Sequence, residues 1–327
     1  MAPSATESTS PSALARKSTI KLHALSAGHL TLPERFFVHP ASQTARRTVP
    51  SLSFLLQHQH PISKKITRIV FDLGLRRNIE RYSEPIRRHA ATRSPLTTDP
   101  DVVKSLAAGG LTPDDIDYII YSHVHWDHVG EPRDFRKSTF VVGNGALNLL
   151  RGTCDSLHGS HSFFEANLIP PERTIELQDP REASINIKPT SRMNSPGELD
   201  FHQPWKPIPD LPHTIDLFND GSLYIVDAPG HLPGHINLLV RTSVDRYVYL
   251  AGDACHDRRI MRKQRDIGEW HDDTGRICCI HADREIAEKT IDRIRKLEQK
   301  GVEIIFAHDI EWEEDPRNTS RFLGPRL

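Results

Sequence analysis

The chain has 327 residues, of which 37% are hydrophobic and 26% are charged, and its formal net charge at pH 7 is -1. This composition is typical of a folded globular protein, and the balanced charge gives no electrostatic reason to expect a nucleic-acid or membrane partner. No apolar run approaches the ~20 residues that a membrane-spanning helix requires. We therefore expect a small-molecule substrate as the partner, with no nucleic acid and no membrane.

The four cysteines show no C-x-x-C spacing, and two of them are adjacent (Cys154, Cys255, Cys278 and Cys279). This pattern fits neither a zinc ribbon nor a disulfide framework, so we expect a reducing compartment and a cytoplasmic protein. Residues 1–19 are rich in Ser, Thr and Pro and have no apolar signal segment. They are predicted to form a disordered tail, with an organellar transit peptide as the weaker alternative.

Apolar segments of strand length recur along the rest of the chain, separated by turns and short helical patterns. The predicted strands are 20–38 with a turn at Gly28, 51–58, 67–73, 119–121, 138–142, 174–177, 222–226, 236–240, 247–250 and 303–306. The predicted helices are 101–108, 144–151 and one that begins after Asp283. On this last helix the residues at helical spacing are Ile286, Ala287, Thr290, Ile291, Ile294 and Leu297.

Two stretches allow more than one interpretation. Residues 75–95 carry six arginines, but interspersed glutamates and the lack of an aromatic ladder favour a solvated helix or loop over a phosphate-binding face. The six are Arg76, Arg77, Arg81, Arg87, Arg88 and Arg93. Residues 152–215 are rich in proline and are predicted to be an irregular insertion, either substrate-facing loops or surface padding. We expect residues 20–327 to form a single domain around this insertion.

Four residues capable of binding metal follow the apolar strand Ile119–Tyr121. His123 and His125 share a face of an extended backbone, because alternate side chains point the same way. Asp127 and His128 can turn toward a neighbouring point once the chain begins to coil. Imidazole and carboxylate are ligands that zinc prefers, so this one motif could supply two metal ions a few ångströms apart.

The motif H-x-H-x-D-H at residues 123–128 resembles the signature of the metallo-β-lactamase superfamily. Three later features occur in that family's order: the Gly-His231-Leu-Pro-Gly-His235 segment, Gly252-Asp253 after a strand, and a late strand that ends near His308. The resemblance implies an α/β fold of four layers, an αβ/βα sandwich of two mixed β-sheets flanked by helices. It covers residues from about 20 to 308.

The resemblance also implies a ligand set for two divalent metal ions, most often Zn²⁺. His123, His125 and His231 would hold the first ion; Asp127, His128 and His308 would hold the second; and Asp253 would bridge them. Asp72 and Gly74 match a position that supports the metal loop, and His235 is expected to support the ligands rather than to bind metal.

Within the superfamily, the chain is most similar to N-acyl-homoserine lactone lactonases and to fungal lactone and lactam hydrolases. The implied reaction opens a cyclic ester or amide by attack of a metal-bound hydroxide, with Asp127 passing the proton onward. The chain departs from the lactonases three residues after Asp253, where His256 replaces a tyrosine that assists the substrate carbonyl. His256 is therefore a candidate catalytic residue, and a polar loop residue is the alternative.

Three rival functions stay open, of which a metallo-nuclease is disfavoured because the sequence shows no separate nucleic-acid domain and no basic stripe with aromatic residues. A thioesterase of the glyoxalase II type would use the same ligands on a thioester, and a non-catalytic metal-binding protein would retain them without turnover. Cys255 is expected to be a packed thiol and Trp126 to pack beneath the metal loop. The histidines with no expected chemical role are His158, His161, His202, His213, His271 and His281.

Overall fold

The computed structural model describes residues 18–152, 163–182 and 199–324. The predicted tail at 1–19 lies almost wholly outside these ranges, as does part of the predicted insertion at 152–215, so the tail and that part of the insertion stay predictions. Within the described ranges, no helix is long and apolar enough to cross a membrane.

Two six-stranded mixed sheets form the centre of the described structure. The first sheet contains, in spatial order, β1 (Ile20–Pro33), β3 (Arg46–Gln59), β4 (Ile66–Phe71), β5 (Tyr118–Ile120), β6 (Thr139–Val142) and β7 (Thr174–Glu176). The second contains β16 (Glu303–Ile305), β12 (Arg246–Leu250), β11 (Ile236–Ser243), β10 (Leu223–Asp227), β9 (Leu211–Asp216) and β8 (Lys206–Ile208). Strands β4 to β7 are mutually parallel, and so are β12 and β16.

Shorter elements surround these sheets. Two small pairs are β2 (Val38–His39) with β13 (Asp266–Ile267) and β14 (Glu269–His271) with β15 (Ile277–Cys279). The α-helices are α1 (Glu84–Ala91), α2 (Val102–Ala108), α3 (Ala146–Leu150), α4 (Arg258–Met261), α5 (Arg284–Gln299) and α6 (Ile310–Glu313).

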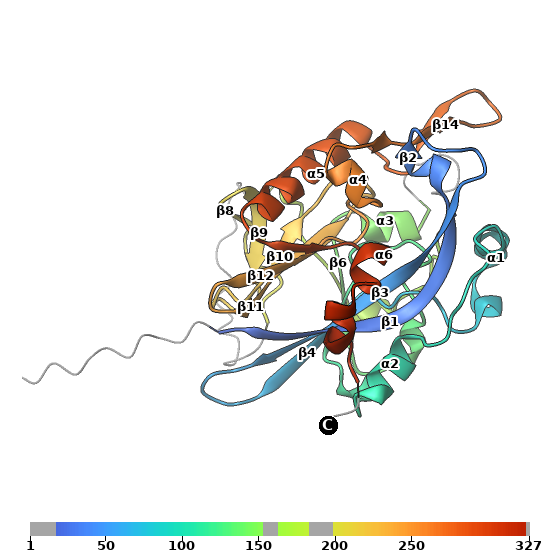
Figure 1. The fold of residues 1–327 in the computed structure, drawn as a ribbon. Coiled ribbons are helices and arrows are strands. Elements are labelled where there is room, and N and C mark those ends of the chain that lie inside the picture. The colour runs from blue at the N-terminus through green and yellow to red at the C-terminus, as the bar shows by residue number, and fades with distance from the viewer. Residues whose placement is uncertain (1–17, 153–162, 183–198, 325–327) are drawn as a thin grey trace, which may run out of the picture.

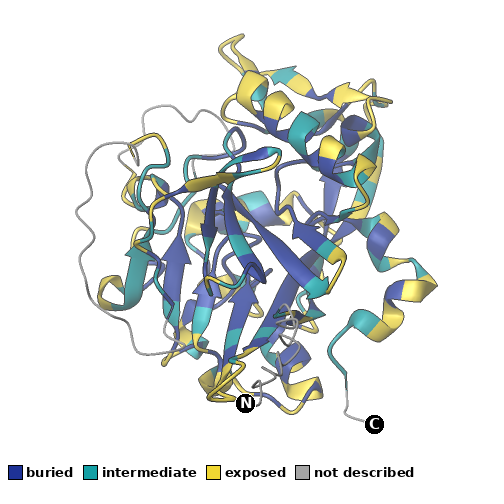
Figure 2. Cartoon of the chain, turned by 90° about the vertical axis from the view of Figure 1, so that its left-hand side faces the viewer, coloured by how far each residue is buried: buried dark blue, intermediate teal, exposed yellow. Residues whose placement is uncertain are grey.

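The two sheets pack face to face, and helices cover their outer faces. Because side chains alternate along a strand, Ile120 and Leu250 enter the apolar core between the sheets. Ile119 packs on the outer side of the first sheet with residues of α2 and α3, and Tyr249 packs on the outer side of the second with residues of α5. Helices α2 and α5 lie on opposite sides of the molecule (Figure 1). The predicted four-layer αβ/βα sandwich is confirmed, with buried strands and exposed outer helix faces (Figure 2).

Three local predictions differ from the structure. Residues 20–33 form one long strand, and Gly28 produces a shift in register within it rather than a turn. Strands β8 and β9 lie inside the stretch predicted to be irregular, so regular structure resumes at Lys206. Ile286, placed on the apolar face of α5, is 37% exposed, whereas the other five residues named for that face are buried.

The arginine-rich stretch also differs from its prediction, because two of its guanidinium groups are not solvated. Arg76 is 1% exposed and Arg93 is 8% exposed. Arg76 donates from Nη2 to Glu165 Oε2 at 2.7 Å and from Nε to the carbonyl of Gly130 at 3.0 Å. The partner Glu165 lies 89 residues away in the sequence, so the sequence pattern could not reveal this buried ion pair.

The functional motifs all follow the carboxyl ends of strands. Residues after β4 and β5 in the first sheet, and after β10, β12 and β16 in the second, carry Asp72, the 123–128 motif, His231, Asp253 and His308. Close packing of the backbone brings these ends together. Gly74 has φ +63°, and a Cβ added there would lie 2.3 Å from Ala27 Cβ, so only glycine fits beside β1.

A histidine–carboxylate pair joins β1 to α6, just beyond His308. Glu313 accepts hydrogen bonds from His29 Nε2 at 2.9 and 3.1 Å, and this contact outweighs burial to raise the pKa of His29 above its ordinary 6.5. A raised histidine pKa stabilises the fold below pH 6.5, and this stabilisation is lost as pH rises through the folded-state value. Glu313→Gln should therefore destabilise the protein by about 0.5–1 kcal/mol at pH 6 and by much less at pH 9.

Urea unfolding at the two pH values measures this difference. Glu314→Gln is the matched control, because Glu314 is exposed next to Glu313. An equal loss of stability for Glu313→Gln at both pH values would contradict the role assigned to His29.

Candidate metal centre

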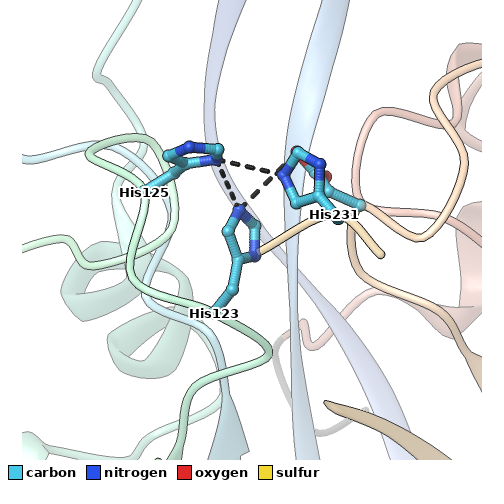
Figure 3. Close-up of side chains that lie close together, drawn as sticks. His123, His125 and His231 are labelled. Atoms are coloured by element: carbon cyan, nitrogen blue, oxygen red, sulfur yellow. Dashed lines mark hydrogen bonds and ion pairs between the residues drawn. The ribbon is translucent and has the colours of Figure 1, made fainter. Parts of the chain in front are cut away.

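Three histidine rings converge at the edge where the two sheets meet. Nδ1 of His125 lies 2.9 Å from Nε2 of His123 and 3.1 Å from Nε2 of His231. Figure 3 shows the three rings turned toward one another, with His231 reaching across from the second sheet. Nitrogen atoms bound tetrahedrally to one zinc ion lie about 3.3 Å apart, so the spacing suits a shared metal ion.

Asp253 lies between this group and a second one formed by Asp127, His128 and His308. Its Oδ2 lies 3.8 Å from His123 Nε2 and 3.6 Å from His231 Nε2. Its Oδ1 faces the other way, 3.3 Å from His128 Nε2 and 3.4 Å from His308 Nε2. Each oxygen of one carboxylate thus faces a different cluster, which is the arrangement that a bridging ligand requires.

Two buried polar atoms of the centre make no hydrogen bond within the described parts of the chain, and they show whether a metal ion would fit between the two clusters. His128 Nε2 and Asp253 Oδ1 are both inaccessible to solvent and make no hydrogen bond to any described residue. Buried polar groups are almost always satisfied, and a cation between these atoms would satisfy both. The donor set is also imidazole nitrogen and carboxylate oxygen throughout, which suits zinc and other divalent first-row metals. The residues present therefore fit two divalent ions.

The ionisation of the side chains at the centre also favours bound cations. Burial raises the pKa of Asp253, but His308 and His128 outweigh burial and hold it well below its usual range. Burial lowers the pKa of His308, but the Asp253 and Asp127 carboxylates outweigh it and raise the pKa to about 10. Burial and neighbouring histidines hold the pKa of His123 and His231 well below 6.5. The two carboxylates are thus ionised and favour positive charge beside them, either on His128 and His308 or on bound cations.

Hydrogen bonds behind the rings fix which nitrogen faces the centre. The Asp72 carboxylate accepts from Ser122 N–H and Oγ–H at 2.7 Å each and from His128 Nδ1 at 2.9 Å. His308 Nδ1 donates to the carbonyl of Pro50 at 2.7 Å. Because these Nδ1 atoms donate, Nε2 of His128 and of His308 is left to bind a metal ion. The supporting role predicted for Asp72 matches this network.

Four other residues discussed from the sequence lie close to the centre. His235 Nε2 accepts from the backbone N–H of Asp253 at 3.1 Å, which is a supporting role. Cys255 is a buried thiol whose pKa burial raises to about 12. His256 Nε2 donates to Asp253 Oδ2 at 3.0 Å, so His256 contacts the candidate metal centre. His281, expected to have no chemical role, is buried with its ring 5.2 Å from that of His231.

A pocket opens over both clusters, and its empty space, including the part open to solvent, is about 430 Å³. Five of its lining residues belong to the two clusters or contact them: His125, Asp127, Asp253, His256 and His308. The other lining residues are Leu30, Leu32, Phe37, His89, Arg93, Trp126 and Ile280. Of these, only Trp126 was singled out near the site from the sequence, because the others lie on segments without a recognisable motif.

Replacing the Asp72 carboxylate, which accepts a hydrogen bond from His128, should weaken metal binding without unfolding the protein. Asp72 has φ +60°, a conformation that asparagine also tolerates, so Asp72→Asn preserves the backbone but loses charge behind His128. We expect zinc affinity to fall by about 10- to 100-fold, measured by competition with a chromophoric chelator. The control is Asp117→Asn, at an exposed carboxylate before β5; equal affinities for both variants would show that Asp72 does not support the centre.

The comparisons with known proteins agree with this geometry. Residues 67–308 match the model of the metallo-β-lactamase superfamily. Cytochrome P450 monooxygenase mpaDE of Penicillium roqueforti is 28% identical over 89% of this chain, and gamma-lactamase FDB1 of Fusarium pseudograminearum is 28% identical over 69%. These alignments span 34% and 50% of the two relatives, so the chain matches half or less of their length.

Among solved structures, a mutant of AiiA from B. thuringiensis with N-decanoyl-L-homoserine bound at the active site has a TM-score of 0.61. The two chains are 19% identical, and the superposition covers 91% of this chain and 96% of the other, which shows a shared fold. Since the family model spans the whole candidate metal centre, the chain belongs to the metallo-β-lactamase superfamily and has the site of a metal-dependent hydrolase.

Proposed function

We propose that this protein is a binuclear hydrolase that opens a cyclic ester or amide. The observation that carries the proposal is Asp253, whose two oxygens face two different groups of ligands beneath one pocket. His123, His125 and His231 would hold the first ion, Asp127, His128 and His308 would hold the second, and Asp253 would be shared between them. Zinc is the expected metal, because imidazole nitrogen dominates the donor set.

Metal ions bound there would polarise a carbonyl group and lower the pKa of a water molecule to about 7. The residues of the chain then orient the substrate and move protons. Asp127 lines the pocket as an ionised carboxylate, 3.5 Å from His308 Nε2. It is placed to accept a proton from the attacking water and to pass it toward the leaving group.

His256 supplies the second polar group of the reaction. Its Nε2 donates to Asp253, whereas its buried Nδ1 makes no hydrogen bond to a described residue. The ring packs against Phe37 at a centroid distance of 5.1 Å, which limits its rotation. We assign Nδ1 the exchange of a hydrogen bond or proton with the substrate, the task for which lactonases carry a tyrosine at this place in the sequence.

The substrate class rests on relatives and on pocket chemistry together. One relative is a gamma-lactamase, and AiiA holds N-decanoyl-L-homoserine at its active site. The pocket lining combines apolar side chains with polar ones, which suits a small ring carrying an apolar body.

The first test compares ring opening with thioester cleavage. Zinc-loaded protein should hydrolyse members of a panel of γ-lactones, N-acyl-homoserine lactones and γ-lactams faster than glutathione or coenzyme A thioesters. His231→Ala should lower kcat/KM by at least about 10³-fold, because the centre loses a metal ligand. His271→Ala, at an exposed histidine on β14, is the control. Preference for thioesters would support the thioesterase instead, and no turnover by any metal-loaded form would support a non-catalytic protein.

The second test concerns His256. His256→Phe keeps the aromatic packing against Phe37 but removes both ring nitrogens, so kcat should fall by about 10²- to 10⁴-fold. Zinc content, measured by mass spectrometry on the same samples, should stay at two ions per chain. A loss of zinc with unchanged turnover per bound metal pair would instead make His256 a residue that only positions Asp253.

A further inference from the structure

Arg93 lies in the wall of the pocket and is 8% exposed. Its guanidinium makes no hydrogen bond or ion pair within the described parts of the chain. Arg76, also buried at 1% exposed, is by contrast paired with Glu165. Burial lowers the pKa of Arg93, while Asp127 raises it and Arg46 lowers it, yet a guanidinium stays charged in proteins.

The backbone holds Arg93 firmly in place. It follows the carboxyl end of α1, where its N–H donates to the carbonyl of Ala90 at 2.9 Å. Its own carbonyl accepts from Thr31 N–H of β1 at 2.8 Å. The side chain therefore starts from a fixed point between a helix and a strand, as a ligand-binding group requires.

A structural role does not explain this side chain. Burying a charge without a partner is unfavourable for folding, so Arg93 costs stability where it is. The carboxylate that acts on it most, Asp127, is already occupied with His308 in the second cluster. The pocket thus keeps a permanent positive charge, with five guanidinium donors, beside the reaction centre.

We propose that Arg93 binds a carboxylate on the substrate, so that the preferred substrate is a lactone or lactam carrying an acidic group. Guanidinium binds carboxylate through two parallel hydrogen bonds, and binding would supply the partner that Arg93 lacks. The apolar wall contributed by Leu30, Leu32, Phe37 and Ile280 contacts the remainder of the molecule. The inference rests on the proposed function and deepens it, because it names a feature of the substrate.

Two lactones of nearly equal shape test this assignment: γ-butyrolactone-γ-carboxylate and γ-butyrolactone-γ-carboxamide. Wild-type protein should favour the carboxylate in kcat/KM by about 10- to 100-fold, the effect of one charge-assisted hydrogen-bonded pair. Arg93→Met should bring the ratio close to one, and Arg93→Lys should restore part of it. Arg88→Met removes a charge from the exposed face of α1 and should leave the ratio unchanged.

Binding provides a readout that does not depend on turnover. Calorimetric titration of metal-loaded protein should show that benzoate binds more tightly than benzamide. The Arg93→Met variant should bind benzoate about tenfold more weakly than the wild type does. Thermal unfolding of Arg93→Met should occur at the same or a higher temperature than in the wild type, because an unpaired buried charge is removed.

The outcomes separate the two proposals. If no variant opens either lactone, the proposed function fails, and benzoate binding still decides the role of Arg93. If both lactones are opened but Arg93→Met leaves their ratio and the benzoate affinity unchanged, the inference is overturned and the hydrolase stands. An equal loss of kcat/KM for both lactones in Arg93→Met overturns it as well, since Arg93 would then act on the shared ring.

Discussion

Asp253 and Asp127 are ionised carboxylates enclosed by histidine rings at the junction of two sheets, and this buried negative charge is what the rest of the centre must balance. Burial makes an uncompensated charge expensive. Without metal, positive charge comes from His128 and His308, whose pKa values the carboxylates raise. Metal ions would replace those protons and leave the rings neutral, which couples metal binding to proton release.

The scaffold is arranged so that strand ends deliver each ligand. Residues in β5 and β12 alternate between the core that joins the sheets and the outer helical layers. Each strand is therefore fixed on both faces before it reaches His123 or Asp253. The backbone N–H of Leu73 donates to the carbonyl of His128 at 2.8 Å, so the metal loop is tied to the strand end that carries Asp72. Rigid placement of this kind holds ligands within the narrow tolerance of a metal site.

Much of this centre was predictable from sequence, because its signals are local. The H-x-H-x-D-H motif, the helix cap at Asp283 and the strands before His231 and His308 are all short-range patterns. The pocket walls were not predictable, since Phe37, Arg93 and Ile280 meet only through tertiary folding. Arg93 shows the difference most clearly: its neighbours in sequence indicate a solvated stretch, whereas β1 and the pocket enclose it. The sequence motifs thus identify the metal ligands, whereas tertiary packing determines the pocket that selects the substrate.

In the proposed hydrolase, Asp253 would bridge two metal ions held by the two clusters. Elemental analysis by mass spectrometry of purified protein, dialysed against zinc and then against buffer, tests it directly. We expect two zinc ions per chain in the wild type, and fewer than two in Asp253→Asn because one carboxylate would serve both ions. One ion or none in the wild type, or two ions retained by Asp253→Asn with unchanged affinity, would contradict a bridging role for Asp253.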